Sequence, residues 1–327
     1  MAEFKSADKL EFETPVFSLD KEINDLEHKQ NRGVGDFTDK IKELKAQREK
    51  KLTEIYKNLS PWEKVLVSRF PGRPGAEDYI ELLLRDQFEL HGDRAFGDDP
   101  AIATVFGYLD DRRILIVAHR KGKTLRDRIA CNFGCAHPEG YRKAMHKMKI
   151  AEKFNISILT LINTPGAYPG IGAEERGQAM AIAENMRFMA GLNVPIINLV
   201  IGEGGSGGAL GIGVGDRSLC MSNAYYSVIS PEGCASILWK DSAKAPDAAK
   251  ALKLTPEDLL KMGLIDGIIA EPVGGAHRYP EKAINAARKV LNATFDELQK
   301  LDIDELKSQR YEKIRKYGKW IETARTV

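Results

Sequence analysis

The sequence predicts an α/β fold, in which buried strands alternate with helices along most of the chain. From residue 79 onward, short apolar runs bounded by turn residues alternate with stretches of helical periodicity. Two of the apolar runs end in glycine-rich loops, and each loop leads into a helical stretch. Because parallel neighbouring strands end at the same edge of a sheet, we expect both loops at one edge, where α/β proteins bind ligands.

The individual elements follow from the period of the apolar residues and from the turn residues that bound them. In chain order they are strands 102–108 and 113–118, helix 138–154, strand 156–162, helix 174–190, strand 194–201, helix 206–214, strand 225–230, a helix from Pro231, strand 265–270 and helix 280–301. Asp110 and Asp111 form the turn of the first strand pair. Pro138 suits the first turn of its helix, where its missing amide is not needed. The basic, amphipathic residues 308–319 are expected to pack or end on the surface.

The first 60 residues differ from the rest, because 25 of them are charged and glycine is rare. Leu19, Ile23 and Leu26 recur at helical spacing, and a second apolar series runs from Ile41 to Leu59. Residues 31–35 lie between the two series as a turn. We therefore expect a helical hairpin arm over residues 1–60, serving oligomerisation or docking as readily as packing, followed by a main domain over 61–327.

Composition excludes several classes of function. The net charge is only +2, so nucleic acid and anionic membranes are not expected as main partners. No apolar run approaches the roughly 20 residues of a membrane span. Residues 1–8 lack the apolar core of a signal peptide, which predicts a cytoplasmic protein. Four cysteines in a chain of this length do not make a disulfide framework.

The segment Gly202–Gly215 is the strongest indication of function, since eight of its fourteen residues are glycine. It follows an apolar strand directly, so backbone amides without side chains come close to whatever lies beside Gly204 and Gly205. If a helix starts at Ser206, its unpaired amides and positive dipole end point the same way. This arrangement predicts a site that stabilises an oxyanion. The earlier loop, Thr164–Gly172, has the same strand-to-helix setting.

Two other motifs overlap this segment. Gly202, Gly204 and Gly207 match the dinucleotide-binding pattern, but several strands precede them and no acidic residue follows at the expected place. Ser206 lies in Gly-x-Ser-x-Gly, the pattern of a serine hydrolase, and Asp266 and His277 follow in the order of a catalytic triad. A serine hydrolase is therefore the alternative function. A non-catalytic scaffold that binds partners through the arm is a third.

Three further groups are weaker candidates. Cys131, Cys135, His137 and His146 raise the question of zinc, but their spacing fits no standard finger. Met145-His-Lys-Met148 resembles a biotinylation motif but lies in a helical pattern, where it is expected to form a solvated face. The cations of the loop Lys121–Arg128 could meet phosphates, as on coenzyme A. No convincing metal site or paired-carboxylate site is predicted, as expected for a reaction that needs oxyanion stabilisation but no protein base.

Several stretches together resemble the α subunit of the carboxyltransferase component of multisubunit acetyl-CoA carboxylase. They are residues 90–97, 138–144, 164–177, 200–209, 227–240, 263–266 and 274–278, and the Ser60-Pro-Trp-Glu63 start of the main domain is typical as well. The resemblance covers nearly the whole chain. It implies a crotonase-like fold of repeated ββα units rather than a doubly wound sheet.

The resemblance also implies an activity and partners. The carboxyl group of carboxybiotin, carried on a separate biotin carboxyl carrier protein, would be transferred to acetyl-CoA to give malonyl-CoA for fatty-acid synthesis. The active site would be shared with a zinc-binding β subunit in an α2β2 assembly that works with a biotin carboxylase, and this chain would hold no metal. Gly204 and Gly205 match the amides that stabilise the biotin oxyanion. Residues of the other loop would line the same pocket: Thr164, Gly166, Ala167, Tyr168, Pro169 and Gly170.

The chain departs from the family pattern at one loop. The family usually has Lys-Gly-Arg-Asp-Thr where this chain has Lys121-Gly-Lys-Thr-Leu125. Cys131, Cys135 and His137 also replace the residues expected there. Both glycine loops are intact, so the expected activity is unchanged, whereas a phosphate contact from the basic loop is put in doubt.

Overall fold

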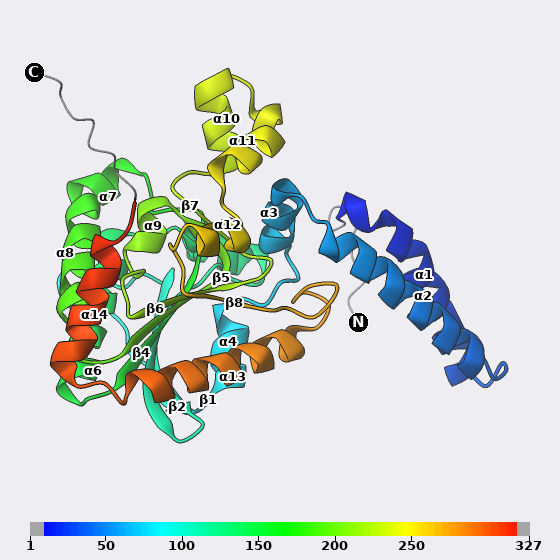
Figure 1. Cartoon of the computed structure of the whole chain (residues 1–327), viewed down its shortest axis with the longest axis horizontal. Helices are drawn as coiled ribbons and strands as arrows, with labels where there is room; N and C mark the ends of the chain where they lie inside the picture. Colours follow the sequence, from blue (N-terminus) through cyan, green and yellow to red (C-terminus); the bar gives the residue numbers. More distant parts are fainter. Residues whose placement is uncertain (1–9, 319–327) are drawn as a thin grey trace, which may run out of the picture.

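The computed structural model describes residues 10–318 and has one mixed sheet at its centre (Figure 1). The strand order is β1-β2-β3-β4-β5-β6-β8, and β7 pairs with β5 near its carboxyl end. The strands are β1 Leu84–Glu89, β2 Ile102–Leu109, β3 Arg112–His119, β4 Ser157–Thr164, β5 Ile196–Gly205, β6 Arg217–Met221, β7 Tyr225–Ser227 and β8 Gly267–Ile269. β1, β2 and β3 pair antiparallel, and every pair from β3 to β8 is parallel.

Helices surround this sheet and bury its strands. In the main body they are α3 Pro61–Arg69, α4 Ala76–Leu83, α5 Leu125–Ala130, α6 Pro138–Lys153, α7 Ile171–Glu175, α8 Gln178–Gly191, α9 Ser206–Leu210, α10 Pro231–Trp239, α11 Ala245–Leu252, α12 Pro256–Lys261, α13 Pro280–Leu298 and α14 Ile303–Arg315. Helix α6 packs on β2, β3 and β4 and against α8, whereas α4 and α13 pack together. Every residue of β4 and β5 is buried, because their runs of isoleucine, leucine and valine lie between these layers.

The predicted elements are largely confirmed, including the β2–β3 hairpin, in which Leu109 pairs with Arg112. The predicted helix 174–190 is wrong as a single element, because Gly177 takes a left-handed conformation (φ +79°) between α7 and α8. The predicted helix 206–214 is too long. Strand β5 continues through Gly205, and α9 ends at Leu210. Strands β1 and β6 were not predicted.

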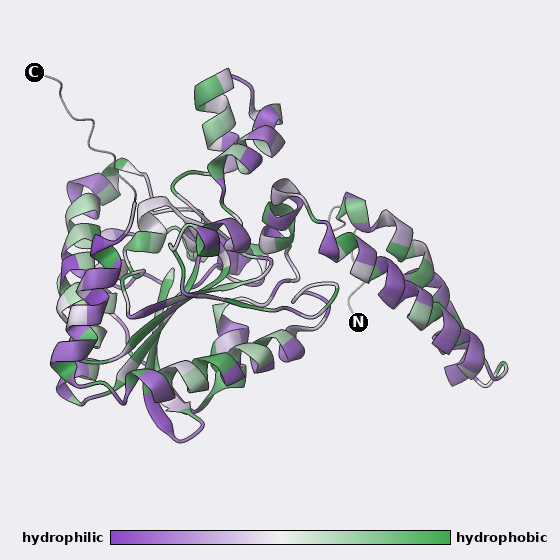
Figure 2. Ribbon diagram, in the orientation of Figure 1, coloured by the Kyte–Doolittle hydropathy of each residue, from purple (hydrophilic) through white to green (hydrophobic). Residues whose placement is uncertain are grey.

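The first described residues form the predicted helical hairpin, with α1 Thr14–Asn31 and α2 Thr38–Lys57 extending away from the body (Figure 1). The two helices pack through Leu19, Ile23, Ile41 and Leu44, a narrow apolar stripe on an otherwise hydrophilic arm (Figure 2). At the base of the arm, the buried carboxylate of Glu13 accepts hydrogen bonds from Tyr56 and from Arg278 of the main body.

Of the two outcomes expected for the carboxyl-terminal stretch, packing is the one observed. Helix α14 packs against α8, and Arg310 is only 1% exposed. Residues 1–8, where no signal peptide is expected, and Lys319, the end of the basic stretch, lie outside the described residues. Within residues 10–318, no helix combines the length and apolar character needed to cross a membrane.

Candidate functional site

The carboxyl ends of three parallel neighbours, β3, β4 and β5, form one edge of the sheet. Their last residues are His119, Thr164 and Gly205. The two glycine loops therefore start side by side, and the prediction that they share one sheet edge is confirmed.

The two loops pack backbone against backbone, with no room for side chains between them. A Cβ atom on Gly205 would lie 2.2 Å from the carbonyl oxygen of Pro165, and one on Gly208 would lie 2.4 Å from the carbonyl carbon of Gly166. A Cβ atom on Gly202 would lie 2.6 Å from the Asn163 side-chain oxygen. Real Cβ atoms do not approach backbone atoms this closely, so glycine is required at Gly205 and Gly208, whereas a side chain at position 202 would displace the Asn163 side chain.

The first loop, residues 164–170, is held in place by hydrogen bonds and by one ring-stacking contact. The Thr164 hydroxyl accepts from the Gly166 amide at 3.1 Å and donates to the Gly166 carbonyl at 2.8 Å. The Tyr168 ring stacks on His137 with 4.2 Å between centroids, and the Gln178 side chain donates to the Tyr168 carbonyl at 2.9 Å. Of the remaining predicted residues, Ala167 and Gly170 are half-buried and Pro169 is exposed.

In the second loop, Gly204 and Gly205 are still part of the sheet. Gly204 pairs with Thr164 of β4 and with Tyr226 of β7, and Gly205 pairs with Ser227. Their amides therefore face neighbouring strands, which differs from the predicted open bend before a helix. The chain leaves the sheet at Ser206, an exposed residue with φ +52°, a left-handed conformation that non-glycine residues rarely adopt and that often marks functional sites.

His119 lies fully buried at this edge. Neither of its ring nitrogens has a hydrogen-bond partner among the described residues. Burial, assisted by the charge of Lys121, lowers the pKa of His119 to about 3, although the backbone of Gly208 and Leu161 acts in the opposite direction. The imidazole is therefore neutral at physiological pH.

Glu203, directly before Gly204, is the buried charge closest to the glycines in sequence, and only 5% of it is exposed. Burial alone would raise the pKa of this carboxyl, but Lys121 and Arg69 outweigh burial and hold the pKa at about 2. Glu203 was not predicted as a functional residue. The sequence pattern that could have indicated it is a single carboxylate at the end of an otherwise apolar strand.

The residues of the alternative catalytic triad lie apart. Asp266 forms an ion pair with Lys313 at 2.7 Å and accepts from the Ser218 amide. The ring of His277 packs against Phe70, with one nitrogen 3.6 Å from Glu13 at the base of the arm. No contact joins Ser206 to either residue in the described part of the chain, so nothing here activates a serine nucleophile.

The other candidate groups serve the fold. Cys131 donates to the Pro100 carbonyl at a sulfur–oxygen distance of 3.6 Å, and His137 contacts Tyr168 and Asn132. Across residues 10–318, no three histidine, cysteine or acidic side chains converge as metal ligands. The solvated face predicted around Lys147 is wrong. Lys147 is 4% exposed and donates to the carbonyls of His91 and Gly92, because its long side chain reaches that loop from α6.

The basic loop Lys121–Arg128 is a short structured segment. Thr124 and Asp127 form a reciprocal cap at the start of α5, and Lys123 pairs with Asp78.

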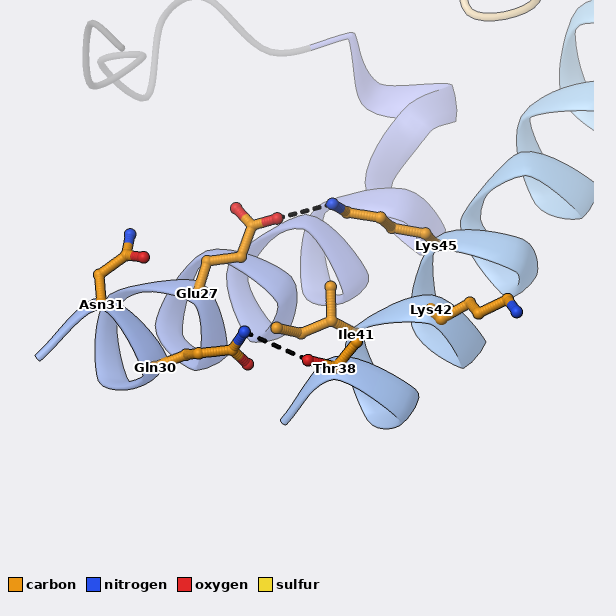
Figure 3. Close-up of a pocket in the computed structure, with 7 residues that line it drawn as sticks. All are labelled: Glu27, Gln30, Asn31, Thr38, Ile41, Lys42 and Lys45. Carbon is orange, nitrogen blue, oxygen red and sulfur yellow. Dashed lines mark hydrogen bonds and ion pairs between the residues drawn. The ribbon is translucent and has the colours of Figure 1, made fainter. Parts of the chain in front are cut away.

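Two pockets lie away from the glycine loops. One of about 470 Å³ lies between α1 and α2 near the tip of the arm, where Gln30 and Thr38 face one another (Figure 3). The other lies beside the β2–β3 turn. Neither is lined by residues of the glycine loops.

Comparison with known proteins gives consistent results. Residues 9–318 match the family described as acetyl co-enzyme A carboxylase carboxyltransferase-like. The chain is 50% identical over 313 residues to the acetyl-coenzyme A carboxylase carboxyl transferase subunit alpha of Rhodopirellula baltica, covering 96% of this chain and 98% of that protein. It is 48% identical over 313 residues to the Staphylococcus epidermidis protein of the same name, covering 96% of this chain and all of that one.

Solved structures share the fold at low sequence identity. Transcarboxylase 12S superposes with a TM-score of 0.54 at 18% identity, over 78% of this chain and 45% of that one. The geranyl-CoA carboxylase β subunit of Pseudomonas aeruginosa gives 0.55 at 15% identity, over 76% of this chain and 45% of that one. The chain thus spans less than half the length of each. The predicted crotonase-like fold is confirmed by these neighbours.

Proposed function

This chain belongs to the acetyl-CoA carboxylase carboxyltransferase family as an α subunit, and we propose that its two glycine loops form the biotin half of the active site. The reaction transfers a carboxyl group from biotin to acetyl-CoA and produces malonyl-CoA. The single observation that carries the proposal is the backbone contact between Gly205 and Pro165 and between Gly208 and Gly166. It brings the main chains of the two loops into direct contact, at the edge of the sheet where α/β proteins bind ligands.

Bound carboxybiotin would supply the carboxyl group and a basic ureido group, so the chain itself needs amide donors rather than a general base. The main chain of the two glycine loops fits such a group, because a flat ureido ring needs close approach of the backbone. Loop 164–170 would hold the ring through Thr164, Gly166, Ala167, Tyr168, Pro169 and Gly170. Losing one oxyanion donor typically costs about 3–4 kcal/mol of transition-state stabilisation.

We propose that Gly204 and Gly205 supply these donors. Their pairing in the sheet restricts when their amides are free to bind an oxyanion. Their amides occupy the last paired positions of β5, so they serve an oxyanion only when this end of β5 moves away from Thr164 and Tyr226. The amides of the first turn of α9, from Ser206 to Gly208, lack intrahelical partners and are the competing donors.

The partners follow the same proposal. A β subunit that holds zinc and most of the acyl-CoA site would complete the active centre in an α2β2 assembly. A biotin carboxyl carrier protein and a biotin carboxylase would deliver the carboxyl group in the cytoplasm. On this chain, residues 61–327 would form the carboxyltransferase domain and residues 1–60 an assembly arm. Helix α10 supports a partner beside the site, since it exposes Ile237, Leu238 and Trp239.

The test is biotin-dependent decarboxylation of malonyl-CoA by the purified chain with and without its β subunit. We expect activity only in the complex, and G205V should lower it at least 100-fold because its side chain overlaps Pro165. The matched control is G191V, which places a side chain in open space at the end of α8. Activity of the chain alone, or an active G205V complex, would refute the shared site or the role of the glycine segment.

A further inference from the structure

Glu203 holds an unusual concentration of charge at the end of β5. Its carboxylate accepts a hydrogen bond from the Lys121 ammonium, one from Arg69 Nε at 2.7 Å and one from the Tyr225 hydroxyl at 2.9 Å. Its own amide donates to the Asn163 side chain at 3.1 Å. The carboxylate thus has partners from three segments that are distant in sequence.

Each partner belongs to an element that borders the glycine loops. Lys121 follows β3, Tyr225 lies in β7, Arg69 ends α3, and Asn163 directly precedes the first loop. Arg69 extends the cluster further, because its Nη1 reaches Glu232 of α10 at 2.5 Å. Glu203 is the common centre of these contacts and is adjacent to Gly204.

Stability alone does not account for this arrangement. Taking a carboxylate and two cations out of water costs several kcal/mol per ion, so buried ion clusters commonly add little net stability. Lys121 and Arg69 also keep 24% and 26% of their side-chain area exposed. A purely structural cluster would be closed more completely and would not need to lie beside the glycines.

We propose that Glu203 is a positioning residue for carboxyl transfer, which holds Lys121 and Arg69 against the end of β5 and so fixes the point at which the glycine segment leaves the sheet. The inference rests on the proposed function of that segment. Among residues 10–318, the Lys121 ammonium has one hydrogen-bond partner, Glu203, so two of its three N–H donors are unused there. Glu203 acts through these neighbours and does not itself contact the reacting groups.

The experiment compares E203Q with D216N in the complex with the β subunit. Both substitutions neutralise a buried carboxylate that borders β5, but Asp216 lies at the opposite end, where the Ile196 amide donates to it. We expect E203Q to lower kcat of biotin-dependent malonyl-CoA decarboxylation by 10- to 100-fold, with KM changed less than twofold. D216N should keep kcat per folded complex within twofold, whatever its loss of stability.

A second readout is independent of activity. Hydrogen exchange of the amides of residues 202–210 should quicken at least tenfold in E203Q and not in D216N. If E203Q keeps its kcat and its exchange rates, or if D216N changes both equally, the positioning role is refuted. If the wild-type complex transfers no carboxyl group while E203Q still quickens exchange, the proposed function fails and the positioning of the segment by Glu203 stands.

If E203Q does not fold, a substitution of Lys121 tests the same proposal. Lys121 is partly exposed, so K121Q should fold, and we expect it to lower kcat about tenfold with KM unchanged. Where both fold, the double variant E203Q/K121Q should be no slower than E203Q alone, because the two residues act as one unit. Losses that multiply, or a K121Q enzyme with full kcat, would overturn the proposal.

Discussion

The two ends of β5 each carry a buried carboxylate, and they differ in how completely it is enclosed. At the start of the strand, Asp216 accepts two bonds from Arg310, at 2.8 and 2.9 Å, and Arg310 also donates to the carbonyls of Met189, Leu192 and Val194. Neither side chain is more than 2% exposed. At the other end, the Glu203 side chain is also buried, at 7% exposed, but its cations remain about one-quarter exposed.

This difference distinguishes a structural ion pair, Asp216–Arg310, from the cluster around Glu203 at the proposed active site. The Arg310 guanidinium satisfies the carbonyl groups at the end of α8 and the loop before β5, so its donors are used within the fold. The cations of the cluster at Glu203 keep about one-quarter of their side-chain area exposed, at the end of the strand where the glycine loops meet. One strand is thus anchored at its start by a saturated pair and carries an incompletely saturated cluster where chemistry is proposed.

The largest effect should come from the start of the strand. R310M leaves Asp216 buried without its counter-charge, and breaking such a pair typically costs about 3–5 kcal/mol. Urea unfolding monitored by circular dichroism measures this loss. The decarboxylation rate per folded complex should stay within twofold of wild type. A loss of unfolding free energy below about 1 kcal/mol, or a tenfold lower decarboxylation rate per folded complex, would contradict the purely structural role of the Arg310–Asp216 pair.

Acid should act on the site edge through His119. The folded-state pKa is about 3, below the unfolded value near 6.5, so the unfolded chain binds the extra proton first. The contribution to stability is complete above pH 6.5 and is lost as pH falls toward 3. At pH 5 the loss is about 2 kcal/mol.

The measurement is urea unfolding of wild type and H119M at pH 7.5 and pH 5. Groups common to both proteins cancel in the comparison, so wild type should lose about 2 kcal/mol more than H119M between the two pH values. Equal losses would mean that the ring of His119 is solvated in the folded chain.

A smaller change sharpens the cluster itself. Y225F removes only the hydroxyl that donates to Glu203 and accepts from Arg69 Nη2 at 3.0 Å. Losing these two hydrogen bonds, each with a net value of about 0.5–1.5 kcal/mol, should lower the unfolding free energy by about 1–2 kcal/mol. We expect kcat to fall several-fold with KM unchanged, as measured by steady-state kinetics. A change confined to KM would indicate that the hydroxyl serves binding rather than positioning.

The smallest effect is expected at Ser206. S206A removes a hydroxyl that makes no contact with Asp266 or His277, so kcat should remain within twofold. Phosphonate labelling of the wild-type chain should leave Ser206 unmodified. Stoichiometric labelling would restore the serine hydrolase alternative.

The sequence predicted what depends on local pattern. Period and turn residues identified β2, β3, α6 and β4, and the shared strand-to-helix setting of the two glycine loops correctly predicted that they lie together. Local pattern did not show that β5 runs through Gly205, because glycine has low strand preference and its place in the sheet is set by β4 and β7.

The missed features depend on distant partners. Lys147 and Arg310 look like surface residues in their own helices, and their burial follows from carbonyl groups supplied by other segments. The importance of Glu203 follows from Lys121 and Arg69, which are 82 and 134 residues away. Such pairings become visible only when the chain is folded.

The hairpin that projects from the body has a practical use. Its distal turn carries Gly33 at φ +75° and Val34 with 65% of its area exposed, while its fastening through Glu13 lies at the opposite end. A fluorescent reporter or affinity tag inserted there would extend outward from the molecule. Assembly could then be followed by energy transfer, with the probe placed away from the main body of the protein.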